Sequence, residues 1–155
     1  SWSYVPNDRY KSTAKILENL CLIVSRGGNY LLNIAPNAQG EWDPIAYQRL
    51  AEIGTWMKEN GTAIYGTHPV APYEVKTEQG TWVFTENDQL ELFAIFIPVD
   101  FEVMFVELPI NQLNLNGQKN ITALGSTTRY KVKKSSVNVL SYDHKGLPQV
   151  WKLSK

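Results

Sequence analysis

Residues 27–36 of the chain read GGNYLLNIAP, and this stretch decides how the first half of the sequence is interpreted. Its centre, Tyr30–Ile34, is short, almost continuously apolar and bounded by glycine and proline. A run of this kind is typical of a strand that is buried on both faces, as in a parallel sheet. We therefore expect a buried strand at residues 30–34, followed by a turn-rich loop at residues 35–42.

A helical pattern precedes this strand. Residues 11–26 carry apolar side chains at the spacing of a helix with one buried face. Ser12 is the expected N-cap, and Gly27–Gly28 is the expected stop, because glycine accepts the left-handed conformation at a helix end. The single cysteine, Cys21, lies on the apolar side of the pattern, and we interpret it as a small core residue.

A second helix is predicted after the loop. Asp43 is its expected N-cap, and Pro44 takes the first helical position, where a missing N–H costs no intrahelical hydrogen bond. Asn60–Gly61 is expected to end it. The residues that mark its buried face are Leu50, Ile53 and Met57.

Helix, strand and helix in this order are parts of a βα-repeating fold. Two such units cannot close a sheet or cover its edges, so we expect them to need partners that this sequence does not contain. The chain also opens without an initiator methionine, on an aromatic stretch that contains Pro6. We interpret it as a piece of a longer polypeptide.

The hydrophobic period changes to two from about Val70 onward. Short segments rich in β-branched and aromatic residues follow one another, which is typical of an antiparallel β-sandwich. Gly66–Pro72, with its two prolines, is the expected junction, and Asn87–Asp88 is an expected turn. The expected strands lie at residues 81–86, 89–97, 101–108, 122–124, 130–133, 137–140 and 150–153.

Composition excludes several classes of partner. Lys plus Arg and Asp plus Glu each number 15, so no surplus of positive charge exists for nucleic-acid phosphates or an anionic membrane surface. No apolar run approaches the roughly 18 residues that a membrane-spanning helix needs. We therefore expect no nucleic-acid partner and no membrane partner, and no phosphate-binding glycine loop or other motif indicates a cofactor.

Four motifs, in order along the chain, resemble glycoside hydrolase family 29, the α-L-fucosidases. Residues 27–36 resemble the family's late barrel strand, a Gly-Gly-Asn, a leucine run and then Asn-Ile-Gly-Pro. The other three are Ser1–Tyr4 (SWSY), Gly54–Met57 (GTWM) and Asn60–Thr67 (NGTAIYGT). The departures are small: Ser3 and Ala35 replace usual glycines, and His68 stands where a basic or small residue is common. The resemblance covers about residues 1–68, and beyond them it is a β-rich pattern alone.

The resemblance implies a fold and a reaction. Residues 1–68 would be the last βα units of a (β/α)8-type barrel, and residues 69–155 a C-terminal antiparallel β-sandwich, so the fold class is α/β plus all-β. The implied parent is a retaining exo-α-L-fucosidase that removes terminal α-L-fucose from glycans, using two catalytic groups about 5 Å apart. In the family both groups precede the segment that aligns with residue 1. We therefore expect no catalytic residue in this chain, and we expect the N-terminal remainder of the barrel as its partner.

One substrate contact is carried over from the family. Trp2 stands where the family has an aromatic residue that packs against the apolar side of fucose, near its C6 methyl group. An indole face excludes water there and selects a deoxy sugar. Family members that degrade glycans also imply a secreted, periplasmic or lysosomal location.

Several polar residues have structural interpretations beside a functional one. Tyr4 is assigned to packing, with a place in the sugar site as the alternative. Asp43 is assigned to the helix cap, and Asp8 precedes the first helix, where negative charge is favourable. Glu41 follows the expected strand, at the face where barrel active sites lie, and could contact an aglycone.

Histidines and tryptophans complete the candidates. His68 and His144 are more than seventy residues apart, without a ligand-like spacing, so we predict no metal site. Trp82 lies in mid-strand, where a core position and a sugar platform are the two interpretations. Trp42, Trp56 and Trp151 are assigned to packing. A different class of function is also open: a non-catalytic carbohydrate-binding or structural module.

Overall fold

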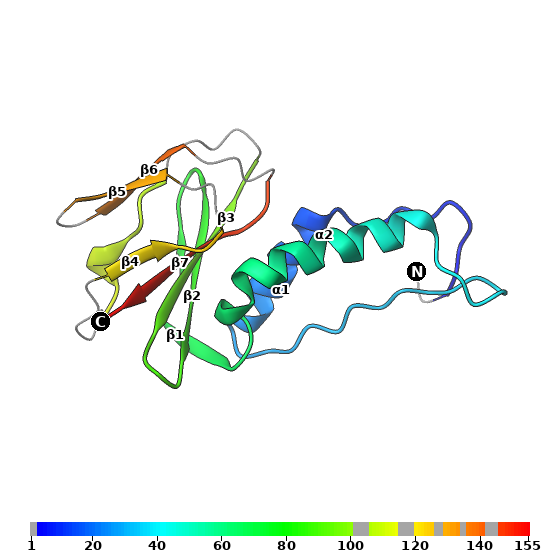
Figure 1. Ribbon diagram of the computed structural model, residues 1–155, viewed down its shortest axis with the longest axis horizontal. Coiled ribbons are helices and arrows are strands. Elements are labelled where there is room, and N and C mark those ends of the chain that lie inside the picture. The colour runs from blue at the N-terminus through cyan, green and yellow to red at the C-terminus, as the bar shows by residue number, and fades with distance from the viewer. Residues whose placement is uncertain (1–2, 101–105, 115–119, 126–128, 134–135, 142–145) are drawn as a thin grey trace.

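The computed structural model describes residues 3–100, 106–114, 120–125, 129–133, 136–141 and 146–155 of the chain. Two helices precede a set of antiparallel strands (Figure 1). The helical elements are α1 (Thr13–Val24), α2 (Pro44–Asn60), η1 (Gly61–Ala63) and η2 (Ile110–Gln112). The strands are β1 (Thr67–Lys76), β2 (Gly80–Asn87), β3 (Leu92–Pro98), β4 (Asn120–Ala123), β5 (Arg129–Lys133), β6 (Ser136–Ser141) and β7 (Gln149–Ser154).

The start and end of α1 confirm the sequence prediction. The Ser12 hydroxyl oxygen accepts a hydrogen bond from the Lys15 N–H at 3.1 Å, which satisfies one of the free donors of the first turn. The helix ends at Val24, and Gly27 adopts a φ of 81°, a conformation that glycine reaches without a side-chain clash. Cys21 is buried, as predicted, and burial raises the pKa of its thiol well above the usual range.

The predicted strand at residues 30–34 is not formed. Residues 28–37 are extended but carry no ladder hydrogen bonds, and Figure 1 shows them running past α1 and α2. Leu31 is 83% exposed, where burial on both faces was expected. The prediction is therefore wrong for this chain, because the described residues offer no neighbouring strand to pair with it.

The β-rich second half confirms the antiparallel part of the fold prediction. One sheet has the strand order β1-β2-β3-β7-β4 and a second pairs β5 with β6, with antiparallel pairing throughout these described strands. The turn at Asn87–Asp88 is also confirmed, since the Asn87 side-chain oxygen accepts from the N–H groups of Gln89 and Glu91. Because of this turn, β3 begins at Leu92 and not at residue 89 as predicted.

One predicted strand, at residues 101–108, is not confirmed. Residues 101–105 lie outside the described part, and residues 106–108 hold only an isolated bridge at Glu107. The other predicted strands have counterparts in β2, β3, β4, β5, β6 and β7.

Strand β1 lies at one edge of the larger sheet and contains both prolines of the Gly66–Pro72 stretch. Its pairing with β2 changes register between Pro69 and Glu74. Proline has no N–H to donate, so it is accommodated at an edge and at a break in the ladder. The chain therefore enters the sheet at Thr67.

The larger sheet is buried on both faces. Alternation along β2 and β3 sends one set of side chains to each face. The outer core, on one face, contains Trp82, Phe84, Leu92, Ala94, Phe96, Val106, Leu108, Leu113, Trp151 and Leu153. The helix-facing core, on the other, contains Leu17, Cys21, Trp56, Ala63, Ile64, Val83, Phe93, Ile95, Ile97 and Val150.

The helix-facing core joins the two halves of the chain. Leu17 and Cys21 come from α1 and Trp56 comes from α2, and all three are buried among residues of the sheet. The Trp56 indole N–H also donates to the Pro148 carbonyl oxygen at 2.8 Å, a buried bond across 92 residues of sequence. The Thr85 hydroxyl of β2 donates to the Ala63 carbonyl oxygen at 2.8 Å. The helices therefore pack directly on the sheet.

The predicted buried face of α2 is partly correct. Ile53 and Met57 pack against the helix-facing core but are only half-buried, and Leu50 is also half-buried. The α2 residue that is fully buried in this core is Trp56, which is next to Met57 in the sequence and was not among the three predicted residues. Among the described residues, no helix is both long enough and apolar enough to cross a membrane.

Candidate functional site

A cavity of about 420 Å³ lies beside the two helices. Its walls come from residues 3–11, α1, the extended residues 30–35 and α2. Of the residues lining it, Asp8 is the single carboxylic acid. A retaining glycosidase needs a second catalytic group about 5 Å from its nucleophile, so this cavity by itself does not supply a carboxylate pair.

A cluster of Tyr4, Tyr10 and Asp43 holds residues 3–11 against the start of α2. The Tyr4 hydroxyl donates to Oδ1 of Asp43 at 3.2 Å, and the Tyr10 hydroxyl donates to Oδ2 at 3.1 Å. We call these three residues the tyrosine–aspartate cluster. Burial, followed by the nearby Asp43 charge and hydrogen bond, raises the pKa of Tyr4 above its usual value. The pKa of Tyr10 is raised as well, by burial first and then by its hydrogen bond to Asp43.

The cluster corrects the predicted role of Asp43. Asp43 does occupy the N-cap position, with extended φ and ψ of −60° and 146°, and Pro44 follows at the first helical position. Its carboxylate nevertheless makes no cap hydrogen bond to the helix, and its two oxygens instead accept from the two phenols. Tyr4, assigned to packing, is thus a hydrogen-bonding residue at the edge of the cavity.

Trp42 and Tyr47 make a ring contact across the same helix start. Their centroids lie 5.5 Å apart at an interplanar angle of 47°. They flank the cap as the residue before it and the fourth helical residue, which is the arrangement of a hydrophobic staple. Trp42 is 37% exposed, and the contact with Tyr47 is part of its predicted packing.

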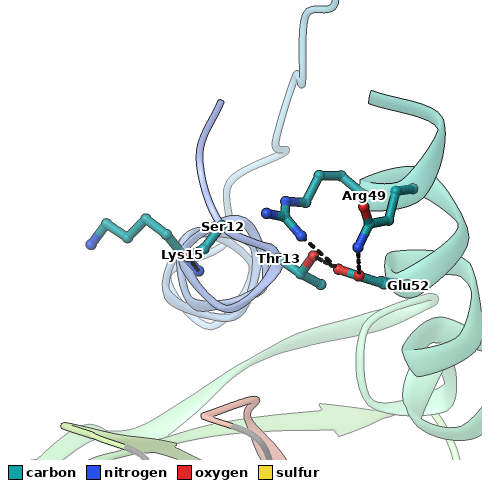
Figure 2. Close-up of polar contacts among 6 residues, drawn as sticks. Ser12, Thr13, Lys15, Arg49 and Glu52 are labelled. Carbon is teal, nitrogen blue, oxygen red and sulfur yellow. Dashed lines mark hydrogen bonds and ion pairs between the residues drawn. The ribbon is translucent and has the colours of Figure 1, made fainter. Parts of the chain in front are cut away.

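A second polar cluster joins α1 to α2, as Figure 2 shows. Glu52 accepts hydrogen bonds from the Thr13 hydroxyl, from Gln48 at 2.8 Å and from Arg49 at 3.1 Å. Its pKa is lowered, mainly by the Thr13 bond and then by the Gln48 bond. Sequence reasoning missed Glu52. The spacings to Gln48 and Arg49 are visible on a helix, but the Thr13 contact depends on tertiary packing.

The remaining predicted site residues fall into two groups, those outside the described part of the structure and those that lie on loops. Trp2 and His144 lie outside the described residues. Glu41 is exposed, and its backbone closes the loop with Asn37 through bonds of 2.8 Å. The Asp8 carboxylate accepts from the Arg9 N–H at 2.8 Å.

The interpretation of Trp82 as a core residue is confirmed. It is 1% exposed and packs against Phe96 and Trp151, with ring centroids 5.0 and 5.2 Å away. His68 is half-exposed, with its Nε2 3.5 Å from a Glu86 carboxylate oxygen. Within the described part of the chain, no group of three or more His, Cys, Asp or Glu side chains could hold a metal ion.

Comparison with known families gives a match over the N-terminal 62 of the 155 residues. Residues 1–62 match the family model described as alpha-L-fucosidase. These residues include α1, the extended segment and α2 with the tyrosine–aspartate cluster.

Curated relatives carry the similarity further along the chain. The tissue alpha-L-fucosidase of Mus musculus is 40% identical over 100 residues, which are 63% of this chain and 22% of the mouse protein. The plasma alpha-L-fucosidase of Rattus norvegicus is 32% identical over 130 residues, or 81% of this chain and 28% of the rat protein. The chain thus spans less than a third of the length of these two relatives.

Solved structures share the fold of the described part of this chain. Alpha-L-fucosidase isoenzyme 1 from Paenibacillus thiaminolyticus aligns with a TM-score of 0.73 and 28% identity, over 99% of this chain and 37% of the bacterial chain. The Thermotoga maritima alpha-fucosidase aligns with the same TM-score and 24% identity, over 98% of this chain and 36% of its own. The helices and the sheet therefore have counterparts of similar arrangement in both structures.

Proposed function

This chain is a relative of the α-L-fucosidases, which are glycoside hydrolases, and we propose that it is the C-terminal part of a retaining exo-α-L-fucosidase. The parent protein would hydrolyse terminal α-L-fucose from glycans or glycoconjugates. The observation that carries this proposal is the family match over residues 1–62, which spans both helices and the segment between them.

In this proposal the nucleophile and the acid/base lie in the N-terminal remainder of the barrel. The cavity beside α1 and α2 is consistent with that division, because Asp8 is the single acid among its lining residues. Trp2 would contact the apolar side of the sugar, as the family resemblance implies. Residues 1–68 would complete the catalytic barrel, and residues 69–155 would follow as the C-terminal β-domain.

The exposed segment at residues 30–34 supports the need for a partner. An apolar run with Leu31 largely in water is costly, since a buried leucine side chain is worth about 1.5–3 kcal/mol of transfer free energy. Extended backbone without a ladder leaves its N–H and C=O groups to water. Both features suit a strand whose neighbours belong to the N-terminal remainder of the barrel.

Release of p-nitrophenol from p-nitrophenyl α-L-fucoside tests the proposal. The full-length protein is expected to turn the substrate over, and the chain alone is expected to release no product. Robust turnover by the purified chain alone would place the catalytic groups within these residues and would overturn the division described above.

A non-catalytic role for the β-domain alone is the second candidate. We favour a bracing role over glycan binding, because Trp82 and Trp151 are buried in the outer core instead of forming an exposed platform. Calorimetric titration of the chain with L-fucose distinguishes them. Measurable heat of binding would favour a glycan-binding module, and its absence would favour the brace. For the parent we propose a secreted, periplasmic or lysosomal location, and a relative named plasma alpha-L-fucosidase supports secretion.

A further inference from the structure

Two N-glycosylation sequons of the form Asn-x-Thr occur in the sequence, and their asparagines lie in different environments in the structure. The sequons are Asn60-Gly61-Thr62 and Asn120-Ile121-Thr122. An oligosaccharide linked to an asparagine is bulky and hydrated, so that asparagine must lie at the surface of the folded protein. The exposure of each asparagine in the fold therefore decides which sequon can carry a glycan.

The first of these asparagines, Asn60, lies in the interior. It is the last residue of α2 and is 4% exposed. Its Nδ2 donates to the Trp56 carbonyl oxygen at 3.0 Å, in a buried hydrogen bond. A glycan on this nitrogen would have to displace the end of α2 from the helix-facing core, which Trp56 and Ala63 help to form. The folded protein therefore has no room for a glycan at Asn60.

The second asparagine, Asn120, lies at the surface. It is the first residue of β4, which is at an edge of the larger sheet. Ile121 and Ala123 pack against the outer core, so the alternation along the strand turns Asn120 and Thr122 to the opposite side. Asn120 and Thr122 are both exposed. The amide that would carry the glycan and the hydroxyl that completes the sequon are thus on the same solvent-facing side.

The amide of Asn120 also keeps its hydrogen bond when it is substituted. Its Nδ2 donates to the Lys155 carbonyl oxygen at 2.8 Å, in an exposed bond. Transfer of an oligosaccharide from a lipid pyrophosphate forms a bond from sugar C1 to Nδ2 and breaks the bond from C1 to the phosphate oxygen. The lipid pyrophosphate leaves, and one of the two Nδ2 hydrogens leaves as a proton. The second hydrogen remains to donate to Lys155, so glycosylation and the folded end of β4 are compatible.

We propose that Asn120 accepts an N-linked oligosaccharide when the parent protein passes through a eukaryotic secretory pathway, and that Asn60 does not. This inference rests on the secreted or lysosomal location in the proposed function, and not on the proposed catalysis. Among the described residues, none of those that line the cavity beside α1 and α2 comes from β4. The glycan would instead cover the outer side of an edge strand, where pairing with another chain would otherwise begin.

The test uses the full-length protein that contains this chain, expressed with a secretion signal in cultured mammalian cells. Folded protein is purified from cells and medium together and is treated with peptide-N-glycosidase in heavy-oxygen water. This enzyme converts a glycosylated asparagine to an aspartate that carries the heavy isotope. Peptide mass spectrometry then reads both sequons in one sample. We expect the isotope label at residue 120 in most molecules and an unmodified asparagine at residue 60.

Two matched threonine variants separate the sequons. Thr122→Ala and Thr62→Ala each remove the hydroxyl of one sequon at an exposed position and leave both asparagines in place. Thr122→Ala is expected to lose the label at residue 120 and the mass of one glycan, whereas Thr62→Ala is expected to keep both. Thr122→Ser keeps a hydroxyl at this position and is expected to retain the label.

Three results would each overturn the inference: an unmodified Asn120 in the folded wild type, a label at residue 60, or a loss of glycan mass in Thr62→Ala. Turnover of p-nitrophenyl α-L-fucoside is measured in the same preparations. A labelled wild type that does not hydrolyse the fucoside would refute the proposed catalysis and leave this inference standing. An active wild type without the label at residue 120 would refute this inference alone.

Discussion

Replacing Trp56 by phenylalanine should weaken the packing of the helices on the sheet, and it should lower the free energy of unfolding more than a substitution of equal size at the surface. The Trp56 indole is 4% exposed, lies in the helix-facing core and donates to the buried Pro148 carbonyl oxygen at 2.8 Å. Phenylalanine fits within the volume of the indole but has no N–H. The substitution therefore leaves an acceptor without its partner and a small void beside it.

The magnitude follows from these two losses. An unsatisfied buried acceptor costs about 1–3 kcal/mol. Loss of part of a large aromatic side chain from a packed core adds about 1–2 kcal/mol for transfer and cavity. The free energy of unfolding is thus expected to fall by about 2–5 kcal/mol. For a protein of this size that is a decrease in melting temperature of roughly 4–20 °C.

Urea unfolding, followed by two probes, measures the effect. Circular dichroism at 222 nm reports mainly on α1 and α2. Tryptophan fluorescence in the Trp56→Phe variant comes from the four remaining tryptophans, of which Trp82 and Trp151 lie in the sheet. In wild type the two transitions should coincide, because one core joins the helices and the sheet. In Trp56→Phe the helical transition should move to lower urea. Trp42→Phe, at an exposed position, is the control and should change the unfolding free energy by less than about 1 kcal/mol. Equal effects of the two substitutions would refute the reasoning.

Three further predictions concern other parts of the chain. Gly80→Ala should lower the free energy of unfolding by about 1–3 kcal/mol in thermal melts, because the added Cβ would lie 2.2 Å from the Ile97 carbonyl oxygen. Gly54→Ala has open space around it in α2 and should raise the free energy of unfolding by up to about 1 kcal/mol, so similar melts for the two variants would contradict this prediction. The lowered pKa of Glu52 contributes stability that is complete above pH 4.5, the ordinary pKa of a glutamate, and that is lost as the pH falls through the lowered pKa. Thr13→Val should move the pKa of Glu52 back toward 4.5 in a carboxyl NMR titration, and an unchanged titration would argue against the Thr13 hydrogen bond. Leu31→Asp should leave the melting temperature of this chain within about 1 °C of wild type but should lower that of the full-length protein, and equal tolerance in both would argue against a buried barrel strand at residues 30–34.

Local chemistry made parts of this fold predictable from the sequence. Ser12 and Gly27–Gly28 mark the ends of α1 through the hydrogen bonding and backbone freedom of individual residues, and both ends of this helix are predicted correctly. The alternation along β2 and β3 is likewise a local pattern, and it identified the strands within a few residues. The family motifs predicted the relationship to α-L-fucosidases because each motif is a continuous run of residues that can be recognised without knowing the fold.

Long-range contacts explain what was missed. The strand at residues 30–34 failed because a ladder needs a neighbour, which no local pattern supplies. Asp43 was correctly located at a helix start, but its partners are 33 and 39 residues away, so its carboxylate could not be assigned to the tyrosines. Trp56 is predicted as a packing residue. Its hydrogen bond to Pro148, 92 residues away, fixes its place in the helix-facing core, and no local pattern indicates that bond.

The helix-facing core has a consequence for building chimeras between related enzymes. In a chimera with its crossover between α2 and β1, Leu17, Cys21 and Trp56 would come from one parent sequence and would have to pack against Val83, Phe93 and Ile95 of the other. With a crossover before Thr13, both sides of this interface would come from the same parent sequence. Modular exchange of the C-terminal part should therefore succeed when the two helices travel with the strands they cover.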